Sequence, residues 1–352
     1  MEALQPGGVR DDGDRALEAL GLFRIPVPVP FPSAGGPVNV VVALEEDGGL
    51  AFLDSGLGTP EAEAALRDGL AARGFSFADA RRILLTHGHV DHYGLAATIR
   101  AESGAPVRIH PADRRKVVDP DRQIGPEYRA FLIRAGARPE DVAPMLAIGG
   151  TSGRFARPVA PPVGDLVAGE RFRFARCEAT VVAMPGHTPG LTCLQFRPRD
   201  GDGPTVFLAS DHLLETVSPN PVLELSPDGE RFPALPTYLA SLRRLADLEP
   251  DWIVPGHGPV FREHRRVIAS LEAFYERRLE RTLAALPPEG ASPVELVEAL
   301  FFARGRPAAS RVELFLMLGE VLGYLDLLAL RGRVTAAERS GVLRYRPAPA
   351  GP

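Results

Sequence analysis

The chain has 352 residues, of which 45% are apolar and 24% are charged, as in an ordinary globular protein. Its net charge of −5 argues against nucleic acid as a partner, because phosphate binding needs many cations. The N-terminus has acids where a secretion signal needs a basic flank, and no stretch reaches the ~18 apolar residues of a membrane span. We therefore expect a cytoplasmic protein that makes no membrane contact.

Two residue types are rare enough to be informative. The two cysteines, Cys177 and Cys193, have no metal-ligand spacing, and we expect both to be buried thiols. Lys116 is the only lysine among 40 lysines and arginines, a skew typical of a high-GC genome.

Short strands and helices alternate along most of the chain, which predicts the α/β class with layered sheets. An acidic, glycine-containing turn at 45–49 predicts a hairpin between the first two strands. The predicted strands are 38–44, 50–53, 82–85, 106–109, 171–174, 178–183, 192–196, 206–209 and 252–254. The predicted helices between them are 60–73, 93–102, 235–248 and 262–286.

The alternation is interrupted from about 119 to 162 by segments that look helical, with no strand between them. An insertion of this kind in a compact domain is typical of a lid or a pocket wall. We therefore expect this segment to form part of a substrate entrance. Tyr128 and Phe131 are the candidates for lining a substrate pocket.

The long helix ends at Pro287-Pro288, which predicts a domain boundary. The expected organisation is a polar N-terminal segment (1–24), a main domain (25–286) and a C-terminal domain (287–352). In the last, predicted helices at 293–302 and 311–330 precede a strand-like 342–345, the order of a winged-helix module. The apolar content of 311–330 indicates packing against the main domain or a homodimer contact.

The segment His87-Gly88-His89-Val90-Asp91-His92 lies between a predicted strand and a predicted helix. Extended backbone places His87 and His89 on the same side, and Asp91 and His92 at the turn can face the same point. Imidazole and carboxylate are the ligands that zinc and similar metals prefer. The segment therefore predicts a metal site.

Three more segments run from a strand into a loop that carries a potential ligand. They contain His187, Asp211 and His257, and glycine beside each histidine allows a sharp turn close to an ion. Asp54 ends an earlier strand in a similar way. Five histidines and two aspartates are enough to bind two metals.

Together these motifs resemble those of the metallo-β-lactamase-fold hydrolases, over about residues 25–285. The resemblance implies an αββα sandwich and two Zn²⁺ ions, with Fe or Mn also compatible. It implies that Asp211 bridges the ions and that Asp54 supports a ligand side chain. The implied ligands are His87, His89 and His187 for one metal, and Asp91, His92 and His257 for the other.

The same resemblance implies hydrolysis by a metal-activated hydroxide, with Asp91 orienting the nucleophile or transferring its proton. The C-terminal helices resemble a branch that includes glyoxalase II-like hydrolases and single-strand endoribonucleases. We expect a small thioester or ester-like substrate. The alternatives are a lactonase, an endoribonuclease and a non-enzymatic metal-dependent binding protein. Residues 287–352 carry 8 arginines and 7 acids, which disfavours the endoribonuclease because nucleic-acid binding needs a basic stripe.

Three histidines lie outside these motifs. His110 and His212 are expected to be structural, and His264 could reach the substrate pocket.

Overall fold

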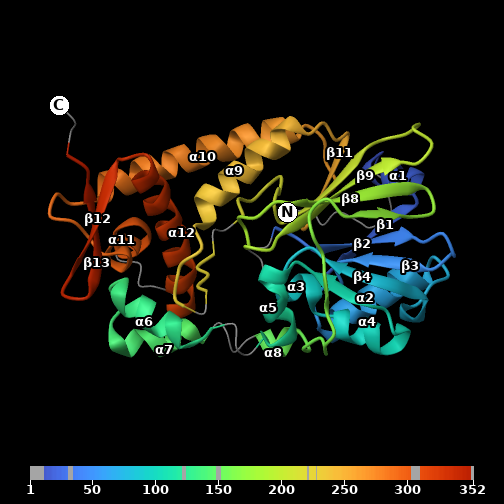
Figure 1. Ribbon diagram of the computed structural model, residues 1–352, viewed down its shortest axis with the longest axis horizontal. Coiled ribbons are helices and arrows are strands. Elements are labelled where there is room, and N and C mark those ends of the chain that lie inside the picture. Colours follow the sequence, from blue (N-terminus) through green and yellow to red (C-terminus); the bar gives the residue numbers. More distant parts are fainter. Residues whose placement is uncertain are drawn as a thin grey trace, which may run out of the picture.

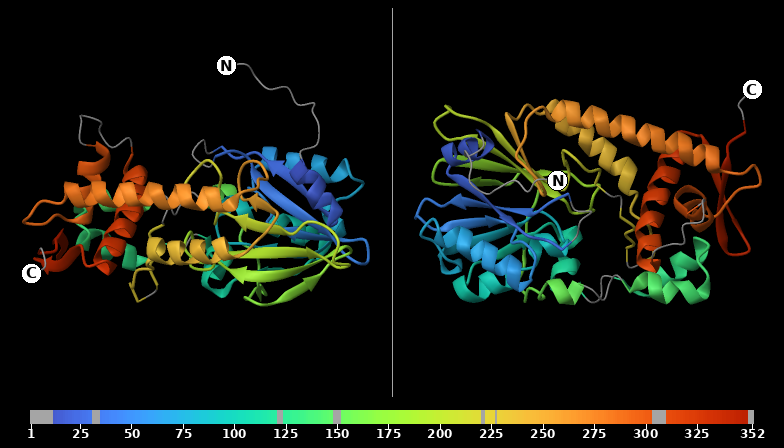
Figure 2. Two further views of the ribbon diagram at one scale, coloured as in Figure 1. Left: turned by 90° about the horizontal axis from the view of Figure 1, so that it is seen from above. Right: turned by 180° about the vertical axis from the view of Figure 1, so that it is seen from behind.

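The computed structural model describes residues 12–30, 35–120, 124–147, 152–219, 222–226, 228–302 and 310–349. Two β-sheets lie face to face in one part of the molecule, and long helices extend from them to a second, mainly helical part (Figures 1 and 2). No helix within these ranges has both the length and the apolar character needed to cross a bilayer.

The first sheet has six strands in sequence order. Strands β1 and β2 are antiparallel, the predicted hairpin joins β2 to β3, and β3 to β6 run parallel. Helix α2 (Pro60–Ala71) packs on its outer face, and Thr59 caps the helix by accepting a hydrogen bond from Ala62 N at 3.3 Å. The strands are β1 (Leu22–Val27), β2 (Val38–Leu44), β3 (Leu50–Leu53), β4 (Ala80–Leu85), β5 (Val107–Ile109) and β6 (Gly164–Asp165).

The second sheet has five strands in the order β11-β10-β9-β8-β7. Only β10 and β11 run parallel; the other neighbours are antiparallel. Helices α9 (Ala234–Asp247) and α10 (His264–Ala285) contribute to the core on its outer face. The strands are β7 (Arg171–Arg173), β8 (Cys177–Ala183), β9 (Thr192–Pro198), β10 (Val206–Ser210) and β11 (Trp252–Pro255).

Side chains buried on both faces of each sheet produce the layers. In β4, Leu84 joins the core between the sheets, whereas Ile83 and Leu85 join the core beneath the outer helices. In β10, Leu208 joins the core between the sheets, whereas Phe207 joins the core beneath the outer helices. Because successive side chains of a strand point to opposite faces, these apolar runs need cover on both sides. The expected αββα sandwich is confirmed.

The insertion packs against the C-terminal helices. Its helices α6 (Pro126–Arg134) and α7 (Pro139–Leu146) lie beside α12 (Arg311–Leu330), where Arg311 Nε is 2.8 Å from Asp141 Oδ1 (Figure 1). Most apolar side chains of α12 are buried within this one chain, although Leu316 is 40% exposed. A homodimer through this helix stays a prediction.

The chain after α10 follows the predicted order. α10 ends at Ala285, immediately before the predicted boundary, and α11 (Pro293–Val297), α12 and an antiparallel pair follow. The pair is β12 (Val334–Arg339) and β13 (Val342–Pro347). The winged-helix assignment stays a prediction, because this element order alone does not decide it.

The expected polar N-terminal segment differs from the structure in its described part. Helix α1 (Asp12–Ala19) contributes the fully buried Leu17 to the core between the sheets. Arg24 Nε lies 2.6 Å from Asp14 Oδ1 and joins this helix to β1. From Asp12 onward the segment is therefore part of the sandwich, because its apolar positions pack as one face.

Candidate metal centre

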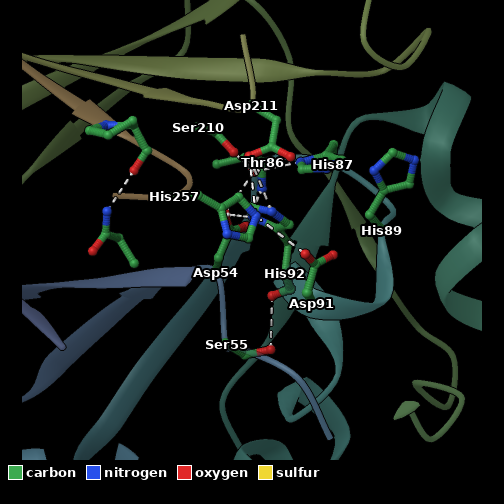
Figure 3. Close-up of polar contacts among 12 residues, drawn as sticks. Asp54, Ser55, Thr86, His87, His89, Asp91, His92, Ser210, Asp211 and His257 are labelled. Carbon is green, nitrogen blue, oxygen red and sulfur yellow. Dashed lines mark hydrogen bonds and ion pairs between the residues drawn. The ribbon is translucent and has the colours of Figure 1, made fainter. Parts of the chain in front are cut away.

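The candidate ligands meet at one edge of the sandwich, where parallel strands of both sheets end (Figure 3). Asp54 follows β3 and His87 follows β4, and in the second sheet Asp211 follows β10 and His257 follows β11. Since each pair of strands is parallel, the carboxyl ends lie side by side. The motifs converge for this reason, although up to 203 positions of sequence separate them, from Asp54 to His257.

The seven predicted ligands form two groups of potential metal donors. Within each group the ligand atoms lie within 4.8 Å of one another. The first group is His87, His89, His187 and Asp211, and the second is Asp91, His92 and His257. The structure therefore brings together all seven residues, with Asp211 among the potential donors of the first group.

Asp211 faces both groups. Its Oδ2 lies 3.4 Å from His187 Nε2, and its Oδ1 lies 3.4 Å from His92 Nε2 and 3.8 Å from His257 Nε2. One carboxylate oxygen therefore serves each group. In the second group, Asp91 Oδ2 is 3.3 Å from His257 Nε2.

The donor atoms fit a cation better than they fit each other. His87 Nε2 is fully buried without a hydrogen-bond partner among the described residues, and leaving such a group unpaired costs about 1–3 kcal/mol. His89 Nδ1 and His187 Nε2 lie 2.9 Å apart, so two imidazoles direct ring nitrogens at the same space. A divalent cation among these nitrogen and oxygen atoms would satisfy them, since they are the donors that zinc prefers.

Hydrogen bonds behind the ligands set their orientation. Asp54 accepts from Thr86 N at 2.7 Å and from Thr86 Oγ1 at 2.8 Å, and its Oδ2 also lies 2.8 Å from His92 Nδ1. Thr86 Oγ1 is 3.1 Å from His87 Nδ1 and 2.8 Å from Ser210 Oγ. These contacts occupy Nδ1 of both histidines and leave Nε2 for the centre.

Two backbone positions at the site have a strained conformation. Asp54 has φ 64° and Ser210 has φ 47°, both in the left-handed region that non-glycine residues rarely adopt. Each adjoins a strand end that carries the site. Strained positions persist where the surrounding contacts determine them, and they cluster at functional sites.

The two groups differ in their affinity for protons. Burial lowers the pKa of His87, His187 and His89, the last to about 3, so these imidazoles are neutral and ready to bind a metal. Burial alone would also lower the pKa of His92 and His257. The neighbouring carboxylates outweigh it and raise both values.

Several other predicted residues lie away from the ligands. His264 is the first residue of α10, and its Nε2 lies 3.0 Å from the carbonyl oxygen of Leu248, after α9. Its side chain therefore does not face the metal centre. Tyr128 and Phe131 are only 5% and 6% exposed and pack in the core shared with α12, where the Tyr128 and Phe315 rings are 6.4 Å apart. They are buried members of this core and do not line an open pocket.

The histidines and cysteines expected to be structural are placed accordingly. His110 Nδ1 accepts from Ala112 N at 3.2 Å, and His212 is fully buried against the Tyr238 ring. Cys177 and Cys193 are buried free thiols.

Some supporting residues were missed by sequence reasoning. Asn39 Nδ2 donates to Pro255 O at 3.0 Å and to Gly258 O at 2.8 Å, which holds the loop of His257. A single amide within the apolar run of β2 was the available signal. Asp113 contacts the loops of the first group, and nothing in its local sequence marked it.

The family model of the metallo-beta-lactamase superfamily matches residues 34–257, which contain both groups of donors. The chain belongs to the metallo-beta-lactamase superfamily. Divalent metal ions are implied by this fold, and the buried histidine and aspartate cluster is present to bind them.

The similarity to several known proteins covers nearly the whole chain. The probable metallo-hydrolase YqjP of Bacillus subtilis is 28% identical over 328 residues, which cover 89% of this chain and 94% of YqjP. The crystal structure of the metallo-beta-lactamase family protein TTHA1429 from Thermus thermophilus is 30% identical with a TM-score of 0.74, covering 93% of this chain and 98% of that one. A beta-lactamase domain protein from Burkholderia ambifaria has the same TM-score at 24% identity and covers 93% of this chain and 92% of its own.

Proposed function

We propose that this metallo-beta-lactamase superfamily member is a dinuclear metal-dependent hydrolase of a small thioester or ester-like substrate. The observation that carries the proposal is the position of Asp211, whose two oxygens face two separate groups of donors. One carboxylate between two groups is suited to bridging two ions. Zn²⁺ is the proposed metal, with Fe or Mn also compatible with these ligands.

A bound pair of divalent ions supplies Lewis acidity, which makes hydroxide available near neutral pH and polarises a carbonyl. The protein supplies the positions of the reacting groups. Asp91 is the proposed catalytic residue, because its carboxylate lies among the donors of the second group, with Oδ2 3.3 Å from His257 Nε2. An ionised carboxylate at this point can orient a water molecule and accept its proton.

The C-terminal region supports a small substrate over RNA. Arg311, Arg331 and Arg333 are already paired with acids, at 2.8 Å from Asp141, 2.6 Å from Glu276 and 3.3 Å from Glu280. Arginines paired in this way offer little charge to phosphates. Lys116 is likewise paired with Asp113 and Glu224, so its charge is not available to an anionic group of a substrate.

The test is metal analysis combined with a substrate panel. We expect about two metal ions per chain by elemental analysis, and turnover of a thioester, an ester or a lactone that a chelator abolishes. His87→Ala should lose both metal and turnover. The matched control, His264→Ala, removes a buried histidine outside the centre and should retain both.

Other results would favour the alternatives. Two metals per chain without turnover on thioesters, lactones, β-lactams or phosphodiesters would favour a metal-dependent binding protein. RNA cleavage that His89→Ala abolishes would favour the endoribonuclease. Ester turnover that persists in His87→Ala would contradict the proposed centre.

A further inference from the structure

A buried aspartate outside the ligand set joins the two loops that carry the histidines of the first group. Asp113, at the end of a short 3₁₀ helix (Pro111–Asp113), is completely buried. Its Oδ2 accepts from Gly88 N at 2.9 Å and from Thr188 Oγ1 at 2.6 Å. Its Oδ1 accepts from Gly190 N at 3.1 Å.

These contacts bear on one half of the metal centre. Gly88 lies between the ligands His87 and His89, and Thr188 directly follows the ligand His187. The bonds therefore fix the relative positions of all three histidines of the first group. Among the described contacts of Asp113, none is with Asp91, His92 or His257.

Lys116, on the adjoining helix α5 (Arg114–Val118), balances the charge of this aspartate. Its Nζ lies 3.2 Å from Asp113 Oδ1 and also pairs with Glu224 Oε1. A buried carboxylate needs such a partner, because removing one ion of a buried pair leaves an uncompensated charge. Burial would raise the pKa of Asp113, but Lys116 and the hydrogen bonds outweigh it and lower that pKa.

The packing explains why this position has lysine in a chain whose other cations are arginines. The stem of Lys116 crosses Gly88 so closely that a Cβ on this glycine would lie 2.7 Å from Lys116 Cδ. The lysine side chain is 13% exposed, and its compact ammonium fits between two carboxylates. The planar guanidinium of arginine is larger and has a different hydrogen-bond geometry.

We propose that Asp113 is a positioning residue for the three-histidine half of the metal centre and that Lys116 holds it in place. This inference rests on the metal centre of the proposed function, but not on any particular substrate. Asp113 contacts the ligand loops and not the metals, so its effect is to reduce the motion of three imidazoles before metal binds. Preorganisation of this kind raises the metal affinity of the first group and leaves that of the second group unchanged.

The experiment is a stepwise Zn²⁺ titration of the metal-free protein against a chromophoric chelator. His257→Ala removes a donor of the second group alone and so assigns the two binding steps. Asp113→Asn should weaken the first-group step by about 10–100-fold, as for other outer partners of metal ligands, and leave the second-group step unchanged. Thr188→Val is a milder variant that should shift the same step in the same direction.

Two further variants test specificity. Asp251→Asn is the matched control, because Asp251 Oδ2 also accepts from a backbone amide and a threonine hydroxyl. These are Thr205 N at 2.8 Å and Thr205 Oγ1 at 2.9 Å. The pair lies just before β10 and β11 begin, at the ends of these strands opposite the metal centre. Asp251→Asn should leave both steps unchanged. Lys116→Arg keeps the charge but should weaken the first-group step as Asp113→Asn does.

The results separate this inference from the proposed function. Wild-type affinity of both steps in Asp113→Asn and Thr188→Val would overturn the inference while the two-metal hydrolase stands. An equal weakening of both steps, with a lower melting temperature of the metal-free protein, would show a general structural role and also overturn it. A selective loss in a protein that hydrolyses no ester would support the inference and count against the proposed substrate. Wild-type affinity in Lys116→Arg would overturn the role given to Lys116.

Discussion

Asp54 Oδ2 lies 2.8 Å from His92 Nδ1, and both side chains are almost completely buried. The contact determines which nitrogen of His92 faces the metal centre, because Nδ1 donates to the carboxylate and Nε2 remains for a metal. Asp54 reaches this position from the end of β3 with φ 64°. A strained strand end therefore orients a predicted ligand of the second group.

Asp54→Asn should weaken metal binding, because an amide oxygen is a poorer acceptor and the amide nitrogen accepts nothing. We expect about a 10–100-fold loss of Zn²⁺ affinity, largest in the second group. A chelator titration measures this, with Asp79→Asn as the control, because the partly buried Asp79 accepts from Ser76 N at 2.8 Å and caps a short helix away from the centre. Unchanged affinity in Asp54→Asn would contradict the role of the contact.

The two groups should release metal at different pH. A metal binds only the deprotonated imidazole, so a histidine with a raised pKa loses its metal to protons at a higher pH. His92 and His257 have raised pKa values, whereas those of His87, His89 and His187 are lowered.

On acidification the second group should therefore lose its ion before the first. The measurement is bound zinc at a series of pH values with buffered free zinc. Two steps are expected in the wild type, and His257→Ala should lack the step at higher pH. Release of both ions in a single step would contradict the assignment.

Gly256→Ala should disturb the carboxylate of Asp211. A Cβ at this position would lie 1.9 Å from Asp211 Oδ1 and 3.1 Å from His92 Cε1. Since Asp211 faces both groups, we expect metal content to fall at both, with an overpacking cost of about 1–3 kcal/mol in folding stability. Elemental analysis and thermal unfolding measure the two effects.

The control for this substitution is Gly164→Ala, where the nearest atom is 3.2 Å away on the long side chain of Arg108. It should retain both metals. If Gly256→Ala also binds two ions, Asp211 does not need the position seen here.

Tyr128→Phe should alter substrate preference while metal content stays intact. The Tyr128 hydroxyl accepts from Leu225 N at 3.1 Å, and the neighbouring Glu224 pairs with Lys116 beside the first group. Removing the hydroxyl leaves a part-buried amide unpaired, which costs about 1–3 kcal/mol and loosens the loop.

Relative kcat/KM across the ester panel is the readout. Tyr324→Phe loses a comparable buried hydroxyl, bonded to Glu320 within α12, and should leave the preference unchanged. Loss of metal in Tyr128→Phe would show that the insertion maintains the centre itself.

Local features of the site could be predicted because neighbouring residues are held by the backbone. The spacing of His87, His89 and His92 after a strand was enough to place three imidazoles together. The strands could also be predicted, since apolar runs bounded by turns leave few other options. By contrast, His264 is close to His257 in sequence but bonds to Leu248, because α10 turns it away from the centre.

The sequence by itself determined the kinds of ligand, the strand ends that carry them and the layered fold. Only the tertiary structure decided how Asp211 divides its oxygens, that Asp113 bonds to Thr188 at a distance of 75 positions along the chain, and that Tyr128 is packed in the core shared with α12. The physical reason is the range of the interactions. Strand pairing and turns depend on adjacent residues, whereas these contacts exist only after two sheets and distant helices have packed together.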